Sequence, residues 1–448
     1  MKVKVISRNP NDYLRETKLD IHKAPRNYDP KLHPFAVQRE YQRALNAVKL
    51  DKIFAKPFIG SLDGHTDVVE CLMKHPTSLS VLVSGASDGE IKIWNVARRQ
   101  CLQTFNAHRG LVRGLCASRT SNHFFSIGDD SAIKQWRYGA SNEDDDIESD
   151  EAVNTLIGRS MIMGVDHHYT KPLLMTCGEK VELWEETRSE PLQSYQWGAD
   201  TVSKIKFNPV ETDICVSTGS DRSLVIYDVK MSKPLRKVIM EMRSNTVSWN
   251  PMEAFHFTAA NEDHDLYTFD MRNLSVPVQV HKDHVSAVID VDYSPTGKEF
   301  VAGSYDKTVR IFPVNKGRSR EVYHTKRMQR LTSVIWSLDN KYIYCGSDEM
   351  DIRIWKANAS EKLGPSMHRE EAAFQYQNKL KEKFAQFPEI SRISRNRHVP
   401  KHVYHSQKEK RAMLQSRKRK EANRRAHSKP GSMPYKSERT KHIVGEEE

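Results

Sequence analysis

Basic residues near the C-terminus are the side chains in this 448-residue sequence with the clearest chemical potential. From residue 392 onward, arginine and lysine recur in short runs such as Lys408-Glu-Lys-Arg411 and Arg417-Lys-Arg-Lys420. Guanidinium and ammonium groups at this density pair with phosphate oxygens, and each contact adds salt-sensitive affinity for nucleic acid. The residues predicted to contact RNA are Arg392, Arg395, Arg397, Lys401, Lys410, Arg411, Arg417, Lys418, Arg419, Lys420, Arg424 and Arg425.

The distribution of charge supports an acidic partner for this tail. Residues 356–448 hold 23 Lys/Arg against 11 Asp/Glu, a net charge of +12. The whole chain carries 70 Lys/Arg and 58 Asp/Glu, also +12, so residues 1–355 balance at 47 against 47. The basic excess therefore lies entirely in the tail, as in proteins whose basic tails bind nucleic acid. A nuclear import signal alone is the simpler alternative, and import is compatible with RNA contact.

Catalytic motifs are missing from the sequence. It contains no G-x-x-x-x-G-K-[ST], no G-x-G-x-x-G and no G-x-S-x-G. His167-His168 is an adjacent histidine pair, but neighbouring residues of a strand point to opposite faces, which argues against a shared metal ion. Asp129-Asp130 resembles a paired-carboxylate site, but Asp130 falls at a structural turn position. We therefore predict no enzyme activity, no metal, no cofactor and no small-molecule substrate.

The cysteines and the apolar runs indicate an intracellular chain without a membrane partner. Six cysteines are scattered, and none forms a C-x-x-C pair, so neither a zinc site nor a disulfide framework is expected. That pattern fits a reducing compartment. The charged start of the sequence does not read as a signal peptide, and no apolar run approaches membrane-spanning length.

A repeat organises the chain before the basic tail. Seven aromatic residues lie 42, 48, 43, 42, 43 and 43 residues apart, and each ends a short alternating run; they are Trp94, Trp136, Trp184, Tyr227, Phe269, Phe312 and Trp355. A period of about 40–45 residues is typical of propeller blades with four strands each. The apolar stretch from Lys56 to Leu62 precedes the first repeat, whereas the last repeat ends at its third strand. We expect this stretch to supply the missing outer strand and to close the ring, which removes free sheet edges.

Polar residues at fixed offsets accompany the aromatic residues. In the first repeat, His65, Ser84, Asp88 and Trp94 are predicted to hydrogen-bond in series between strands. Their spacing resembles the WD-repeat family from about Phe58 to Lys356, with histidines comparable to His65 at His108, His284 and, less securely, His324. Gly178 replaces the expected aspartate of repeat three, and the turn Ser347–Asp351 of repeat seven reads as one residue longer. These two blades are predicted to be less regular.

Segments outside the repeats complete the domain organisation. We predict an N-terminal arm with a short helix over residues 1–55, the propeller over 56–356 and a basic helical tail over 357–448. Residues 39–54 and 367–387 read as amphipathic helices, whose apolar faces pack either on the propeller or on a partner protein. An acidic loop at residues 142–151 is either a solvated connection or a binding site for a basic protein. The expected fold class is thus all-β: a seven-bladed WD-repeat propeller with an N-terminal arm and a helical basic C-terminal extension.

Several segments resemble a narrower family, the WD-repeat proteins with a Sof domain. They include Arg26-Asn-Tyr-Asp-Pro30, Tyr376-Gln-Asn-Lys-Leu-Lys-Glu-Lys-Phe384, Arg397-His-Val-Pro-Lys401 and His427-Ser-Lys-Pro-Gly431. The resemblance spans essentially the full length. It implies a non-catalytic scaffold in ribosome biogenesis, located in the nucleus and nucleolus. Its implied partners are precursor ribosomal RNA and proteins of the small-subunit processome.

The same resemblance implies a second function, because animal members are described as substrate receptors of a cullin-RING ubiquitin ligase. The motif for adaptor binding in such receptors is Trp-Asp-x-Arg at the end of a blade. Its nearest match here is Phe269-Asp270-Met271-Arg272, so Asp270 and Arg272 are the candidate ligase-adaptor residues. Tyr227-Asp228-Val229-Lys230 is a weaker match, because Lys lacks the bidentate fork of Arg.

A third reading is a chromatin or histone binder, in which the mouth of the ring's channel and the acidic loop would capture a basic partner.

Overall fold

The computed structural model describes residues 30–119, 121–138, 151–198 and 200–447, and these form two compact units. One unit joins the N-terminal segment up to Lys56 with residues 359–396, and the other joins residues 57–358 with residues 397–448. The packing thus divides the tail between two units, which differs from the single tail segment expected from the sequence. Among the described helices, none has both the length and the apolar composition needed to cross a membrane.

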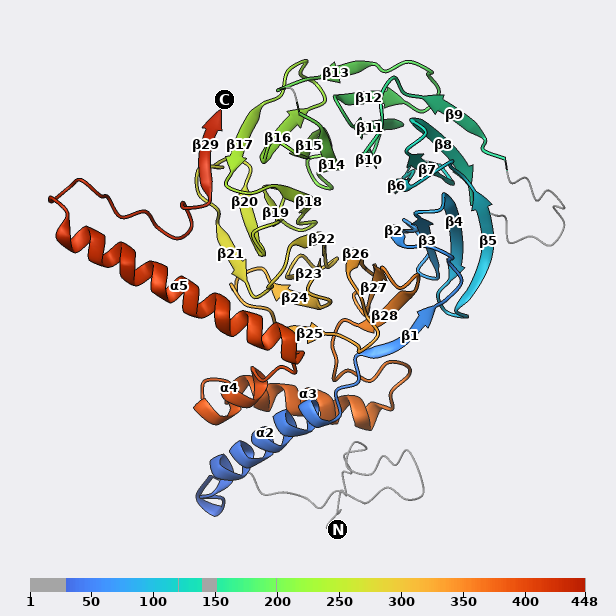
Figure 1. The fold of residues 1–448 in the computed structure, drawn as a ribbon. Helices are drawn as coiled ribbons and strands as arrows, with labels where there is room; N and C mark the ends of the chain where they lie inside the picture. The colour runs from blue at the N-terminus through green and yellow to red at the C-terminus, as the bar shows by residue number, and fades with distance from the viewer. Residues whose placement is uncertain (1–29, 120, 139–150, 199, 448) are drawn as a thin grey trace, which may run out of the picture. The chain divides into compact units, whose positions relative to one another are not determined.

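Within the described residues, the second unit contains seven antiparallel sheets arranged as the blades of a propeller (Figure 1). Blade one is β2 (Val69–Lys74), β3 (Val81–Ala86), β4 (Glu90–Asn95) and β5 (Gln100–Asn106). Blade two is β6 (Val112–Ala117), β7 (His123–Gly128), β8 (Ala132–Arg137) and β9 (Asn154–Ile157). Blade three is β10 (Gly164–His167), β11 (Leu173–Cys177), β12 (Val181–Glu185) and β13 (Gln193–Tyr195). Blade four is β14 (Val202–Phe207), β15 (Ile214–Gly219), β16 (Ser223–Asp228) and β17 (Arg236–Met240), followed by β29 (Ile443–Glu447) on its outer edge.

The remaining blades complete the ring. Blade five is β18 (Ser244–Trp249), β19 (His256–Asn261), β20 (Asp265–Asp270) and β21 (Gln279–Lys282). Blade six is β22 (Val288–Tyr293), β23 (Glu299–Ser304), β24 (Val309–Pro313) and β25 (Glu321–Tyr323). Blade seven is β26 (Leu331–Trp336), β27 (Tyr342–Ser347), β28 (Ile352–Lys356) and β1 (Phe58–Leu62). The predicted closure is confirmed, because β1 pairs antiparallel with β28 and the blade takes its outer strand from the start of the propeller segment.

The core lies between neighbouring sheets. In one cluster, Trp249, Phe257 and Phe269 of blade five pack with Val216 and Ile226 of blade four. All five side chains are almost fully buried. The second strand of a blade is buried at consecutive positions, as in β3, β7, β15 and β19, because neighbouring sheets cover both of its faces. Each blade therefore depends on its neighbours for stability.

The hydrogen-bonded series between strands is complete in blade two. His108 Nδ1 lies 2.9 Å from Asp130, His108 Nε2 lies 2.7 Å from Ser126 Oγ, and Trp136 Nε1 donates to the same Oγ over 2.9 Å. All the polar groups of this series are thereby paired inside the sheet, as buried polar groups require.

Blade one corrects the predicted series of His65, Ser84, Asp88 and Trp94. His65 Nε2 and Trp94 Nε1 both contact Ser84 Oγ, at 2.6 and 2.7 Å. Asp88 does not join them, because its carboxylate accepts hydrogen bonds from Thr66 and from a backbone N–H of its own turn. His65 Nδ1 is buried without a described hydrogen-bond partner, and burial lowers the pKa of His65 to about 4.

The two comparable histidines expected later in the chain differ from each other. His284 Nδ1 lies 3.0 Å from Asp306, but Phe312 has no N–H to extend the series. His324 Nε2 lies 3.1 Å from His398 Nδ1 in the tail, so it does not play the part of His65.

Blades three and seven were both predicted to be less regular. The prediction is confirmed for blade three and wrong for blade seven. In blade three, Leu174 pairs with Trp184, ten residues away, whereas Leu82 pairs with Trp94 across twelve, so the hairpin at Gly178 is shorter. In blade seven, Met350 has φ +70° five residues before the aromatic, just as Gly89 has φ +90° in blade one. The turn of blade seven therefore has the ordinary length, with a glutamate in place of aspartate.

The first unit consists of helices and a short 3₁₀ turn, η1 (Pro30–Leu32). Its helices are α2 (Ala36–Ile53), α3 (His368–Lys383) and α4 (Pro388–Ser394). Their apolar faces cover one another, since Leu45 and Val48 of α2 pack with Leu380, Phe384 and Ile390. The sequence predicted that the apolar face of each amphipathic segment packs on the propeller or on a partner protein. The structure shows instead that the two apolar faces cover each other. Pro388 begins α4, a position at which a helix tolerates proline because its first N–H groups have no partner within the helix.

Candidate nucleic-acid interface

Helix α5 (Lys401–His427) carries most of the residues predicted to contact RNA. It follows Pro400, has no acidic residue in its first turn, and has Arg424, Arg425 and His427 in its last turn, where positive charge complements the helix dipole. Only Val403 is buried in its 27 residues. A helix this polar is not stable by itself, so its position depends on the surface that it contacts.

One face of α5 meets that surface. Val403, Gln407, Lys410, Leu414 and Glu421 are spaced by three, four or seven residues, which puts them on one side of a helix. Three of them line a cavity shared with strand β21 of blade five, and Figure 1 shows α5 beside that strand. The propeller therefore provides the surface on which the polar helix is ordered.

Arg397 holds the chain to blades five and six just before α5. Its Nη1 lies 2.9 Å from Asp283 Oδ2 and 2.5 Å from Ser319 Oγ. Burial alone would raise the pKa of Asp283, but the hydrogen bond from Ser319 and the charges of Arg310 and Arg397 lower it. Arg397 was predicted to contact RNA, and the structure places it in a contact with the propeller.

Lys410 forms the corresponding contact within α5. Its Nζ lies 3.6 Å from Asp265 Oδ1, while Lys282 Nζ lies 3.7 Å from Asp265 Oδ2. Burial raises the pKa of Asp265 despite the two neighbouring cations. Lys410 thus faces the propeller rather than solvent.

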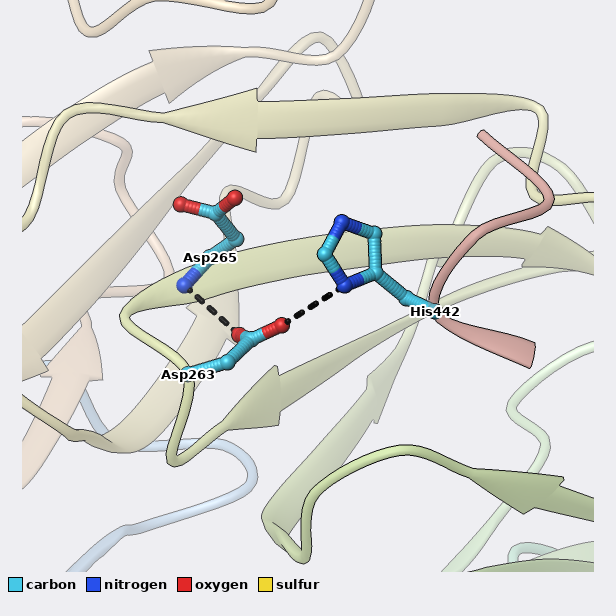
Figure 2. Close-up of side chains that lie close together, drawn as sticks. All are labelled: Asp263, Asp265 and His442. Carbon is cyan, nitrogen blue, oxygen red and sulfur yellow. Dashed lines mark hydrogen bonds and ion pairs between the residues drawn. The ribbon is translucent and has the colours of Figure 1, made fainter. Parts of the chain in front are cut away.

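The end of the chain returns to the propeller as strand β29, which pairs antiparallel with β17 from Lys237 to Met240. His442, just before this strand, has its Nδ1 3.5 Å from Asp263 Oδ2 (Figure 2). The same Nδ1 lies 3.3 Å from Glu241 Oε2. Between α5 and β29, Lys441 pairs with Glu421 over 2.9 Å. Helix and strand are therefore attached to the propeller at separate blades and to each other.

Asp263, Asp265 and His442 are the described residues whose types and spacing suit a metal ion, with their ligand atoms within 4.8 Å of one another. Figure 2 shows a different arrangement, in which Asp263 contacts His442 and the backbone N–H of Asp265. Lys282 and Lys410 already supply positive charge beside Asp265, which disfavours a further cation. We interpret the group as the polar anchor of β29.

Several cations of α5 are exposed and keep their positive charge. Six of the predicted RNA contacts are exposed, and in the described part of the chain no carboxylate lies within ion-pair distance of them; they are Lys401, Arg411, Arg417, Arg419, Lys420 and Arg424. Lys418 and Arg425 instead pair with Glu438 and Glu421. The two remaining residues, Arg392 and Arg395, belong to the helical unit, where Arg395 Nε donates to the Ser391 carbonyl over 3.1 Å.

The candidate ligase-adaptor residues lie at the end of β20. Arg272 Nε and Nη2 donate to the two carboxylate oxygens of Asp270 over 3.1 and 2.8 Å. The guanidinium also lies 4.2 Å from the centroid of the Phe255 ring, and its side chain is 61% exposed. In the weaker match, Lys230 Nζ turns to Asp213 at 2.8 Å. Both cations are exposed, but only the first motif pairs its cation with the aspartate of the motif itself.

The adjacent histidines do not share a ligand position. His167 Nε2 lies 2.6 Å from Glu186, whereas His168 Nε2 lies 3.2 Å from Asp213. The acidic loop predicted as a possible binding site lies almost wholly outside the described residues.

Sequence reasoning missed strand β29 and the acidic residues that receive the tail. The short run His442-Ile-Val-Gly445 was a weak signal for a strand, because an edge strand needs only backbone pairing. Asp265 and Asp283 gave no signal, since aspartates near hairpin ends are ordinary turn residues in most of the blades.

Comparisons with known proteins agree with this architecture. The model of the Sof1-like domain matches residues 357–443, and the WD domain, G-beta repeat model matches residues 56–95, 99–137, 275–312 and 321–356. A DDB1- and CUL4-associated factor 13 from Xenopus tropicalis is 58% identical over 99% of both chains, and its Homo sapiens counterpart is 57% identical over the same shares. Protein SOF1 of Saccharomyces cerevisiae is 46% identical, over 99% of this chain and 95% of its own.

Among solved structures, the WD40 β-propeller domain of Doa1 superposes with a TM-score of 0.56 at 17% identity. It covers 67% of this chain and 96% of that chain, and so supports the fold alone. Full-length identity of this degree, together with the matching models for both parts, shows that the chain belongs to the Sof1 family of WD-repeat proteins, whose animal members are named DDB1- and CUL4-associated factor 13.

Proposed function

We propose that the chain is a non-catalytic scaffold in ribosome biogenesis, acting in the small-subunit processome during processing of precursor ribosomal RNA. WD40 propellers and the Sof1 family indicate a scaffold or adaptor rather than a catalyst. In this function the propeller holds protein partners and the tail contacts RNA. The work takes place in the nucleus and nucleolus, where precursor ribosomal RNA is made.

One observation carries the proposal of RNA contact: the cations of α5 differ in whether a carboxylate of the propeller lies beside them. Lys410 faces an aspartate of the propeller, whereas Arg417, Arg419 and Arg424 are exposed. A fixed helix with unneutralised guanidinium groups presents phosphate-binding sites in a set geometry, because the cost of ordering the helix is met by the propeller. The RNA-contacting set that we propose is therefore the exposed cations of α5.

The test replaces Arg417, Arg419 and Arg424 together by Glu in the full-length protein. Filter binding to a single-stranded RNA is then measured across salt concentrations. We expect weaker binding and a slope of log Kd against log salt that is smaller by about 2, since each single-strand phosphate contact contributes about 0.7.

A matched control replaces Arg98, Arg188 and Lys233 together by Glu; these three residues are exposed on the propeller. It has the same change in net charge. Equal loss of affinity in both triple variants would show that total charge, not the exposed cations of α5, attracts RNA.

A second candidate function is a substrate receptor of a cullin-RING ubiquitin ligase. The animal relatives carry DDB1 and CUL4 in their name, and Arg272 is held in an exposed fork by Asp270. Preorganisation of this kind lowers the cost of ordering an arginine at an interface.

Binding of purified DDB1 to the full-length chain tests this candidate. Arg272→Ala is expected to abolish it and Lys230→Ala to leave it unchanged. Undiminished DDB1 binding by Arg272→Ala would remove this motif from the contact.

A further inference from the structure

A cavity of about 460 Å³ lies where α5 and the segment after it meet blades five and six. Strand β21 contributes Val280 and Lys282, and α5 contributes Lys410, Arg411 and Leu414. This volume is in the range of pockets that hold small organic molecules. Its walls combine two apolar side chains with several charged ones, which suits a ligand with a flat apolar face and polar edges.

Asp265 supplies an unsatisfied acceptor to this cavity. The residue is 6% exposed, and its Oδ1 is buried with no hydrogen-bond donor among the described residues. The ammonium groups of Lys410 and Lys282 stand at 3.6 and 3.7 Å, beyond hydrogen-bond distance. A buried carboxylate oxygen without a donor is costly, so a ligand that donates an N–H there gains affinity. The cavity thus offers an acceptor flanked by two donors.

The charges around the cavity are not balanced. Arg318, Arg411 and Arg439 line it, and within the described ranges no carboxylate is placed within ion-pair distance of any of them. Its other carboxylates are already engaged, Asp283 by Arg397 and Glu438 by Lys418. The excess positive charge favours an anionic ligand.

We propose that this cavity binds one unpaired guanine nucleotide of RNA, an inference that rests on the proposed RNA-contact function of α5. The Watson–Crick edge of guanine presents N1–H and N2–H beside the O6 acceptor, which matches a carboxylate flanked by lysines. Val280 and Leu414 contact the face of the base. The arginines at the cavity receive its phosphate, so that the cavity binds one base while the exposed cations of α5 contact the RNA backbone.

The test uses full-length protein and single-stranded RNA decamers of adenosine with one central base varied. We expect the guanosine decamer to bind about tenfold more tightly than the adenosine, cytidine or uridine decamers, the size of one well-formed base contact. A central inosine, which lacks the N2 amino group, is expected to lose part of that preference. This comparison needs no protein variant.

Asp265→Asn then tests the assigned residue, with Asp200→Asn, an exposed residue between blades three and four, as matched control. The first variant is expected to lose the preference for guanosine while keeping the salt slope, and the control to keep both. Equal affinity for all four bases, or a preference that survives Asp265→Asn, would overturn the pocket assignment. Steep salt-dependent binding without base preference would leave the proposed RNA function intact, whereas absence of binding to every decamer would overturn both.

Discussion

Arg397 and Asp283 lie 114 positions apart in the sequence, yet the Arg397 Nη1 is 2.9 Å from the Asp283 Oδ2. This contact fixes the start of α5 to the propeller. The Asp283 side chain is 5% exposed, so truncating its partner leaves a buried carboxylate with less compensation.

Arg397→Ala is expected to lower the free energy of unfolding by about 3 kcal/mol, the lower end for breaking a buried pair, because Arg310 remains 4.0 Å away. Amide hydrogen exchange along α5 should increase at the same time. Protection of α5 unchanged from wild type would show that the helix is held without this contact.

Removal of residues 443–448 tests the role of β29. Without it, the outer edge of β17 loses its backbone partners between Lys237 and Met240. We expect faster amide exchange in β17 and in α5, since Lys441 also ties this segment to Glu421. His442→Ala should give a smaller change in the same direction. Faster exchange confined to β17 would mean that strand and helix are attached independently.

The complete polar series of blade two predicts a measurable cost for removing its shared serine. Ser126→Ala removes the shared partner of His108 and Trp136, and leaves two buried polar groups unpaired. A loss of about 2–4 kcal/mol in unfolding free energy follows from the cost of such groups. In blade one, Ser84→Ala has a similar cost by the same two contacts.

The variants Asp130→Asn and Asp88→Asn compare the role of the turn aspartate in blade two with its role in blade one. Only Asp130 contacts the histidine, so Asp130→Asn is expected to lower the thermal midpoint more than Asp88→Asn does. Equal shifts for the two asparagine variants would contradict the difference seen between the blades.

His281 gives the propeller a predictable pH dependence. Its ring is fully buried between Thr268 Oγ1 and the Lys316 carbonyl, and burial lowers its pKa to about 4. In the unfolded chain the same imidazole takes up a proton near pH 6.5. The stability that depends on the neutral ring of His281 is therefore fully present above about pH 6.5 and is lost as the pH falls toward 4. Protonation of His281 lowers the free energy of unfolding by about 3 kcal/mol over this range.

Denaturant titrations at pH 7, 5.5 and 4.5 measure this effect, and His281→Gln serves as the control that no longer takes up the proton. The slope of stability against pH between 6.5 and 4 should be smaller in the variant. Identical slopes would assign the acid sensitivity to other groups, such as His65, whose pKa is also lowered to about 4 by burial.

The repeat made most of the fold predictable, because the spacing of Trp94 and its counterparts is enforced by the length of a four-stranded blade. Ring closure by β1 was predictable for a related reason, since a missing outer strand and a spare apolar segment have one simple solution. The turn of blade seven was not predictable from its letters. Glu349 in place of aspartate made the segment look longer, and only the backbone conformation of Met350 settled its register.

The site was predictable in type but not in detail. Dense positive charge identified the tail, but nothing in its sequence distinguishes Lys410, which faces Asp265, from Arg417, which faces solvent. That division depends on acidic residues more than a hundred positions away. The mutual covering of α2 and α3 escaped prediction for the same reason, because amphipathic periodicity gives a helix face and not its partner.

The most direct test of the central claim is crosslinking in cells, followed by sequencing of the RNA attached to the full-length protein and to its Arg417, Arg419 and Arg424 to Glu variant. The account predicts precursor small-subunit ribosomal RNA enriched on the wild-type protein and strongly reduced on the variant, with the Arg98, Arg188 and Lys233 control unchanged. No RNA above background on the wild-type protein, or equal enrichment on the α5 variant, would contradict it.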